Sequence, residues 1–137
     1  MPPLRVLSIF GTRPEAVKMA PVVAALARTA GIESRVCVTA QHREMLDQVL
    51  ELFRIVPEHD LDIMKDRQDL FDIAAGVLTG FKKVLAEERP GMPMVVVGWG
   101  GDRWMRFADY CLGYDKILPP NVIFTCHDNI DASFGPN

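Results

Sequence analysis

Hydrophobic positions along the chain follow two different spacings that alternate from one end to the other. Short runs rich in β-branched residues predict buried strands, at residues 4–10, 34–40, 92–97 and 121–125. Between them, apolar residues recur every three or four positions and predict helices, from near residue 12 and over residues 42–53, 70–89 and 104–112. This alternation predicts an α/β fold with a doubly wound parallel sheet and helices on both of its faces.

The loops that lead from strands into helices are the places to look for chemistry. In parallel sheets of this kind, ligands bind beyond the carboxyl ends of the strands. The predicted elements put three loops there, at residues 11–18, 39–43 and 98–103. Residues 56–68 are the one long polar connection, and we expect them to form a surface loop.

The first of these loops, in "FGTRPEAVKMAP" (10–21), has the features of a helix start. Thr12 and Glu15 have the T-x-x-E spacing of a capping box, and Pro14 suits the first turn. Capping does not explain Arg13 and Lys18, because two cations near the amino end of a helix oppose its macrodipole. A phosphate or diphosphate bound there would compensate them, whereas a Lys18 that points into water would need no ligand.

Length and charge exclude several classes of protein. The 137 residues fit a single domain, and the formal net charge of -3 gives no broad basic field, so neither nucleic acid nor an anionic membrane surface is expected as a partner. No stretch is long and apolar enough for a membrane helix. The three cysteines are widely spaced, which indicates neither a disulfide framework nor a metal site and favours the cytoplasm.

Longer motifs point to a known family. The segments "FGTRPEAVKMAP", "VCVTAQHREMLDQVLELF", "DLDIM" and "DRQ" closely resemble the amino-terminal part of the bacterial non-hydrolysing UDP-N-acetylglucosamine 2-epimerases. The resemblance covers about residues 4–89. It implies a Rossmann-like domain that forms one half of a GT-B-type fold, in which two such domains face each other across a cleft that holds the nucleotide sugar.

The resemblance also implies a reaction and a set of ligands. The family interconverts UDP-N-acetylglucosamine and UDP-N-acetylmannosamine for surface polysaccharide synthesis, by elimination and re-addition of UDP, and no cofactor is expected. Arg13 and Lys18 match its cationic pair, which stabilises the departing diphosphate. A second set of residues matches the positions that contact a UDP-sugar activator in bacterial members: Gln41, His42, Arg67 and Gln68.

The last third of the chain departs from the family pattern. After residue 90, Gly101 and Asp102 keep the Gly-Asp pair at a strand end, so Asp102 is the candidate catalytic aspartate, but the hydroxyl-rich turn of the family is absent. Asp102 could instead cap the following helix. The family's second carboxylate has no clear match, and Asp128 lies near the right place in a different context. His127 is not expected to bind a metal, because adjacent side chains of an extended segment point to opposite faces.

These observations predict one Rossmann-like domain over residues 1–137, of which 1–90 are epimerase-like and 91–137 are a divergent continuation. The family's second domain is absent from this length, so we expect the chain to be inactive alone and to need that domain or a second copy of itself. The alternative is a noncatalytic α/β domain, of chimeric origin, that binds a nucleoside diphosphate.

Overall fold

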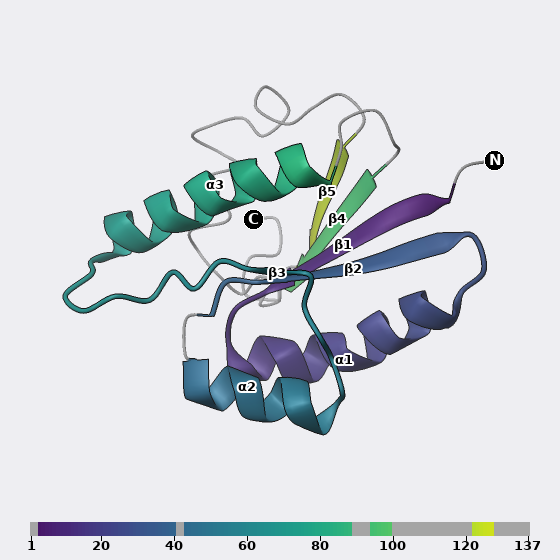
Figure 1. The fold of residues 1–137 in the computed structure, drawn as a ribbon, viewed down its shortest axis with the longest axis horizontal. Coiled ribbons are helices and arrows are strands. Elements are labelled where there is room, and N and C mark those ends of the chain that lie inside the picture. Colours follow the sequence, from purple (N-terminus) through teal and green to yellow (C-terminus); the bar gives the residue numbers. More distant parts are fainter. Residues whose placement is uncertain (1–2, 41–42, 89–93, 100–121, 128–137) are drawn as a thin grey trace, which may run out of the picture.

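A computed structural model describes residues 3–40 and 43–88 of the chain, and the backbones of residues 94–99 and 122–127. The strands are β1 (Leu4–Phe10), β2 (Ile32–Val38), β3 (His59–Asp60), β4 (Met94–Trp99) and β5 (Val122–His127). The helices are α1 (Arg13–Arg28), α2 (Arg43–Leu52) and α3 (Leu70–Glu87). Figure 1 shows these elements along the chain.

The five strands form one parallel sheet in the order β3-β2-β1-β4-β5. The chain moves outward from β1 to β2 and β3, and α3 then carries it across to β4 on the other side of β1 (Figure 1). The order therefore reverses between β1 and β4, where Ile9 pairs with Gly98. This parallel, doubly wound order confirms the predicted fold class. Doubly wound sheets bind their ligands at the reversal point, so the turn after β1 lies at the expected place.

Helices cover both faces of the sheet, with α1 and α2 on one side and α3 on the other (Figure 1). The first core lies under α1 and α2, and its buried residues are Phe10, Ala16, Met19, Val23, Val36, Val38, Ala40, Leu46, Val49 and Leu50. The second core lies under α3, where Leu7 and Cys37 pack against Phe81 and Val84. Alternate residues of β1 and β2 thus contribute to opposite cores, because successive side chains of a strand point to opposite faces.

Most predicted elements are confirmed, and two details are wrong. β1 has the predicted bounds, and β2, β4 and β5 lie within two residues of theirs. Residues 56–68 are not wholly a surface loop, because they contain β3 and the buried Ile63. The apolar stripe of α3 does not extend to its start, where Leu70 is 81% exposed. The helix predicted over 104–112 lies outside the described residues.

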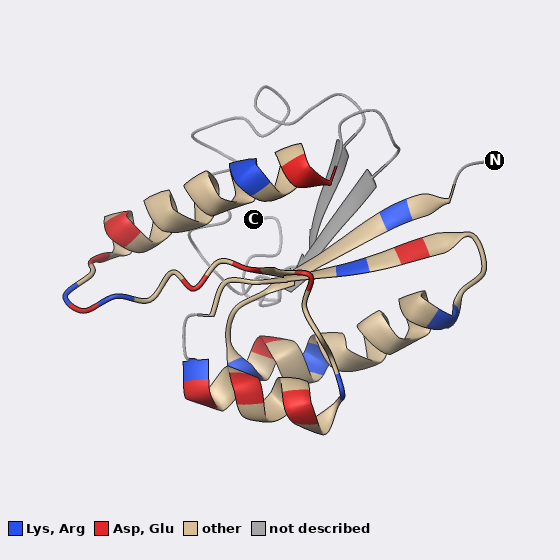
Figure 2. Ribbon diagram, viewed as in Figure 1, with Lys and Arg blue, Asp and Glu red and all other residues tan. Residues whose placement is uncertain are grey.

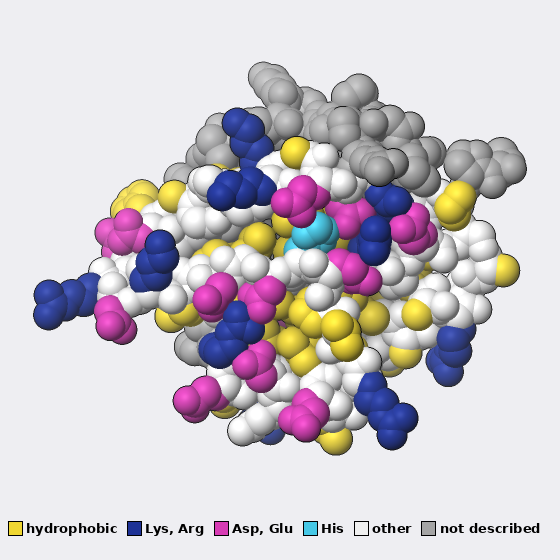
Figure 3. Space-filling view, viewed as in Figure 1, with side chains coloured by type: hydrophobic (Ala, Val, Ile, Leu, Met, Phe, Trp, Pro, Cys, Tyr) yellow, Lys and Arg dark blue, Asp and Glu magenta, His cyan; other side chains and the backbone are white. Residues whose placement is uncertain are grey.

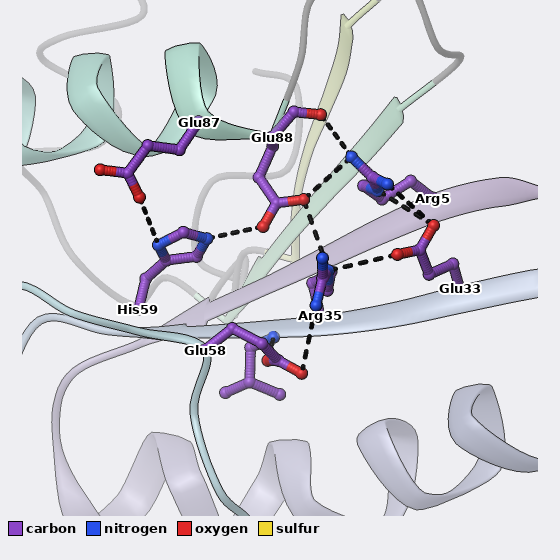
Figure 4. A network of polar contacts seen from close by, with 8 residues as sticks. Arg5, Glu33, Arg35, Glu58, His59, Glu87 and Glu88 are labelled. Atoms are coloured by element: carbon purple, nitrogen blue, oxygen red, sulfur yellow. Dashed lines mark hydrogen bonds and ion pairs between the residues drawn. The ribbon is translucent and has the colours of Figure 1, made fainter.

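A network of charges joins the end of α3 to the sheet (Figure 4). Arg5 of β1 is buried and donates to Glu33 of β2 through Nε (3.2 Å) and Nη2 (2.9 Å). Its Nη1 lies 3.1 Å from the carboxylate of Glu88, and Arg5 also donates to the main-chain carbonyl of that residue. Glu88 is only 3% exposed and also contacts Arg35 (3.5 Å) and His59 (2.6 Å). Glu88, the first residue after α3, therefore contacts residues of β1, β2 and β3.

The free edge of β2 is closed by Glu58, the residue before β3. The Glu58 main-chain N–H donates to the carbonyl of Val36 (3.0 Å), and the Glu58 carboxylate accepts the N–H of Val36 (2.7 Å). Beyond this point β3 continues the ladder for only two residue pairs, Cys37 with His59 and Val38 with Asp60. The Glu58 carboxylate thus takes the place of a main-chain carbonyl as the acceptor for the Val36 N–H, directly before β3 begins.

Candidate functional site

The turn between β1 and α1 is closed by a carboxylate. Thr12 and Glu15 form the predicted capping box, in which Glu15 Oε2 accepts the main-chain N–H groups of Gly11 (2.8 Å) and Thr12 (3.0 Å). Two backbone donors of this turn are therefore already bound to Glu15. An anion that uses the N–H groups of Gly11 and Thr12 would therefore have to displace this carboxylate.

Arg13 and Lys18 lie in the first two turns of α1, and both side chains are exposed. Five residues correspond to about 140° around an α-helix, so the two cations flank the amino end of α1 and do not share one face. The role of this pair as diphosphate ligands stays a prediction.

The second region of interest lies where the paired strands β2 and β3 end. After β3 the chain continues beside β2, because the N–H groups of Leu61 and Ile63 donate to the carbonyls of Val38 (2.8 Å) and Thr39 (3.1 Å). The 61–68 loop therefore begins beside residues 38–39, directly before the candidate activator residues Gln41 and His42. Those two residues lie outside the described part of the chain.

The other two candidate activator residues lie at the far end of this loop. Gln68 closes it, because its Oε1 accepts the N–H of Lys65 (2.8 Å) and its Nε2 donates to the carbonyl of Ile63 (2.8 Å). Arg67 is exposed and has a positive φ of 61°. Gln68 therefore has a structural role in addition to the binding role predicted for it, and Arg67 is presented to solvent beside it.

A cluster of three aspartates surrounds Arg43, the first residue of α2. Arg43 makes a two-pronged contact with Asp60, at 2.7 Å from Nη1 and 2.8 Å from Nη2, and contacts Asp62 (3.1 Å) and Asp47 (3.3 Å). The sequence analysis placed Arg43 in a candidate ligand loop at residues 39–43 and did not predict its contacts with these aspartates. Asp60 and Asp62, two residues apart in the polar connection at 56–68, were the signal that could have indicated this cluster.

The remaining candidates are not tested by the structure. Asp102 and Asp128 lie outside the described residues. Among the residues that the structure does describe, no group of three or more His, Cys, Asp or Glu side chains is placed to hold a metal ion. Within the same residues, no helix is both long enough and apolar enough to cross a membrane. Acidic and basic side chains are intermixed over the surface seen in Figure 3.

Cys37 of β2 is a buried thiol that lies near the carboxylates of Asp60 and Glu88. Burial raises its pKa from 9.0 to about 12, and the negative charges of Asp60 and Glu88 act in the same direction. At pH 8.5 its thiolate fraction is therefore expected to be about a thousandfold below that of an ordinary cysteine. Iodoacetamide labelling followed by peptide mass spectrometry should leave Cys37 unmodified in the folded chain and modify it in denaturant. Equal labelling under both conditions would contradict this placement.

Comparison with known proteins identifies the family. A family model described as UDP-N-acetylglucosamine 2-epimerase matches residues 24–114. The chain is 60% identical over 92 residues to the UDP-N-acetylglucosamine 2-epimerase of Yersinia pestis and 58% identical over 92 residues to that of Escherichia coli K12. Each match covers 67% of this chain and 24% of the relative.

Solved structures agree with this match. The chain is similar to the Neisseria meningitidis UDP-GlcNAc 2-epimerase bound to UDP-GlcNAc, with a TM-score of 0.67 and 42% identity over 88% of this chain and 31% of that one. It is also similar to Staphylococcus aureus MnaA in complex with UDP, with a TM-score of 0.69 and 40% identity over 88% of this chain and 30% of that one. The chain thus spans a quarter to a third of the length of these relatives, and it belongs to the UDP-N-acetylglucosamine 2-epimerase family.

Proposed function

We propose that the chain supplies the amino-terminal half of the nucleotide-sugar cleft of a UDP-N-acetylglucosamine 2-epimerase, with Arg13 and Lys18 as ligands of the UDP diphosphate. The observation that carries this proposal is the position of both cations at the start of α1, which follows β1 at the reversal point of the sheet. A helix amino terminus attracts anions, and side-chain cations beside it add to that attraction, so this arrangement suits a diphosphate.

The reaction fits these groups. A base removes the C2 proton of the sugar, the bond between C1 and the UDP oxygen breaks, and UDP leaves as an anion from a 2-acetamidoglucal. UDP then adds back to C1 as a proton returns to the opposite face of C2. Arg13 and Lys18 would bind the diphosphate most tightly when its leaving oxygen carries the full negative charge, which lowers the barrier for both steps. Asp102 is the proposed carboxylate of this chain for the proton transfer.

Activity would require a second Rossmann-like domain to complete the cleft. Residues 1–137 would then act as one domain, paired with a carboxyl-terminal partner or with a second copy of the chain. We place the reaction in the cytoplasm, in agreement with the three widely spaced cysteines. Gln41, His42, Arg67 and Gln68 would contact a second UDP-sugar that activates the enzyme. The loop that carries Arg67 and Gln68 begins beside Val38 and Thr39, which supports a shared site.

The cationic pair can be tested by calorimetry with UDP. Arg13→Ala and Lys18→Ala are each expected to weaken UDP binding by about tenfold, because each removes a charge-assisted hydrogen bond to the diphosphate. Arg28→Ala is the matched control, since Arg28 lies in the last turn of the same helix. An affinity that is unchanged in both variants would overturn the assignment.

Proton exchange separates the catalytic proposal from a noncatalytic binding domain. Incubation with UDP-N-acetylglucosamine in heavy water should give loss of the C2 proton signal only when a complementary second domain is added. UDP binding without any exchange, even with that domain present, would favour the noncatalytic alternative.

A further inference from the structure

A groove opens between the later part of α1, the middle of β2 and residues 53–58, which follow α2. It has a volume of about 610 Å³, and its apolar wall includes Val17, Val36, Phe53 and Val56. Val17, Phe53 and Val56 are 45%, 45% and 83% exposed, so large apolar side chains meet solvent here. Figure 1 shows the 53–58 segment leading from α2 toward the sheet past α1. None of the groove residues belongs to the turn between β1 and α1, so the groove is distinct from the proposed diphosphate site.

The size and walls of this groove are those of a small-molecule site. Pockets for small ligands have volumes of about 300–1,000 Å³ and mostly apolar walls with a few polar groups. On the side of α1, the groove is lined by Ala20, Ala24 and Ala27, which are four and three residues apart and therefore lie on one face of the helix. These short side chains leave space that longer ones would fill.

Arg54 places a positive charge at the groove, and Figure 2 shows this basic position in blue between α2 and β3. It ends α2 with a positive φ of 55°, where the N–H of Ile55 donates to the carbonyl of Leu50 (2.8 Å) and the N–H of Arg54 to that of Glu51 (3.1 Å). Glycine is the usual residue at such a helix end, because it adopts a positive φ without strain. Within residues 3–40 and 43–88, the Arg54 guanidinium has no carboxylate partner. A strained, unpaired cation beside an apolar groove favours an anionic ligand.

The other polar groups of the groove are compatible with an anion. The Glu58 carboxylate already accepts the N–H of Val36 (2.7 Å) and lies 4.0 Å from the Arg35 guanidinium, which offsets its charge. Ser34 Oγ is a buried atom with no hydrogen-bond partner among the described residues, which is an unfavourable state for a hydroxyl. Because Ser34 as a whole is partly exposed and lines the groove, rotation about χ1 turns its O–H toward a ligand there.

We propose that this groove binds a small organic carboxylate, whose apolar body lies against α1 and Phe53 and whose charge is paired with Arg54. The hydroxyl of Ser34 supplies a second polar contact. A neutral molecule of the same shape gains the wall contacts without the charge interaction, and an apolar cation is repelled by Arg54. This site depends neither on the epimerase reaction nor on the proposed diphosphate ligands.

Amide NMR of the full chain, titrated with octanoate, tests the proposal. Saturable shifts are expected at Ala24, Ser34 and Ile55, with a dissociation constant of about 1 mM, while α3 amides stay unchanged. Ala24→Phe places a ring in the groove and should abolish these shifts. Ala25→Phe is the matched control, because Ala25 is equally exposed on α1 but does not line the groove.

The charge is tested by Arg54→Gly, which also relieves the positive φ. Octanoate binding should weaken about three- to tenfold, binding of 1-octanol should stay within about twofold, and the urea midpoint should rise. The absence of saturable shifts in the unaltered chain, equal binding by Ala24→Phe, or equal octanoate affinity in Arg54→Gly would each overturn the proposal. Analytical ultracentrifugation tests the other occupant: a dimer that Ala24→Phe dissociates would show that a second copy fills the groove, which also overturns it.

Discussion

Glu88→Ala is expected to lower the free energy of unfolding by about 3 kcal/mol, because it leaves the buried Arg5 without one of its two carboxylate partners. Removing one member of a buried ion pair typically costs about 3–5 kcal/mol, and the lower end applies here because Glu33 and the main-chain carbonyl of residue 88 still bind Arg5. Urea unfolding followed by circular dichroism measures the change.

The neighbouring residue provides the control for this experiment. Glu87 also contacts His59, at 3.4 Å, but its side chain is 66% exposed. Glu87→Ala should therefore change the free energy of unfolding by less than about 0.5 kcal/mol. Equal losses for the two variants would show that burial of the Glu88 carboxylate is not what makes the network strong.

Phe81→Ala is expected to cost about 3–5 kcal/mol, because it opens a cavity in the core that holds α3 against the sheet. Phe81 is 8% exposed and lies in the same core as Leu7, Cys37 and Val84. The loss should be visible as a lower urea midpoint. It should be accompanied by faster amide exchange along α3, because α3 is the element whose packing is removed.

Phe71, on the same helix, separates packing from helix propensity. It is 80% exposed, so Phe71→Ala removes the same atoms without opening a core cavity. Alanine is the better helix former, and the variant should be neutral or slightly more stable. A loss in Phe71→Ala close to that of Phe81→Ala would mean that the start of α3 is covered in solution.

Local signals in the sequence predicted much of this fold. The bounds of β1 and the start of α1 were predictable because an apolar run is followed at once by a capping pair and a proline, all within residues 4–15. The parallel, doubly wound order followed from the alternation of strands and helices. The same neighbourhood supplied Arg13 and Lys18 as candidates, because their charge conflicts with the local helix end.

Features made by distant residues were not predictable in this way. β3 is two residues long and exists because Cys37 and Val38 pair with it, so no periodic pattern marks it. The partners of Arg5 lie 28 and 83 positions away, at Glu33 and Glu88, and nothing local distinguishes Arg5 from a solvated residue. The family resemblance supplied Gln68 as a candidate activator residue, and no local pattern indicated that its amide closes its own loop.

The carboxylate of Glu58 has a consequence for self-association. An outer strand with unpaired main-chain groups invites another chain to add to the sheet. Here the Val36 N–H is occupied by an acidic side chain, with the Arg35 guanidinium 4.0 Å from the same carboxylate. A strand arriving from a second molecule would have to displace this ion pair and desolvate both charges, so this border of the sheet resists polymerisation into extended β-structure.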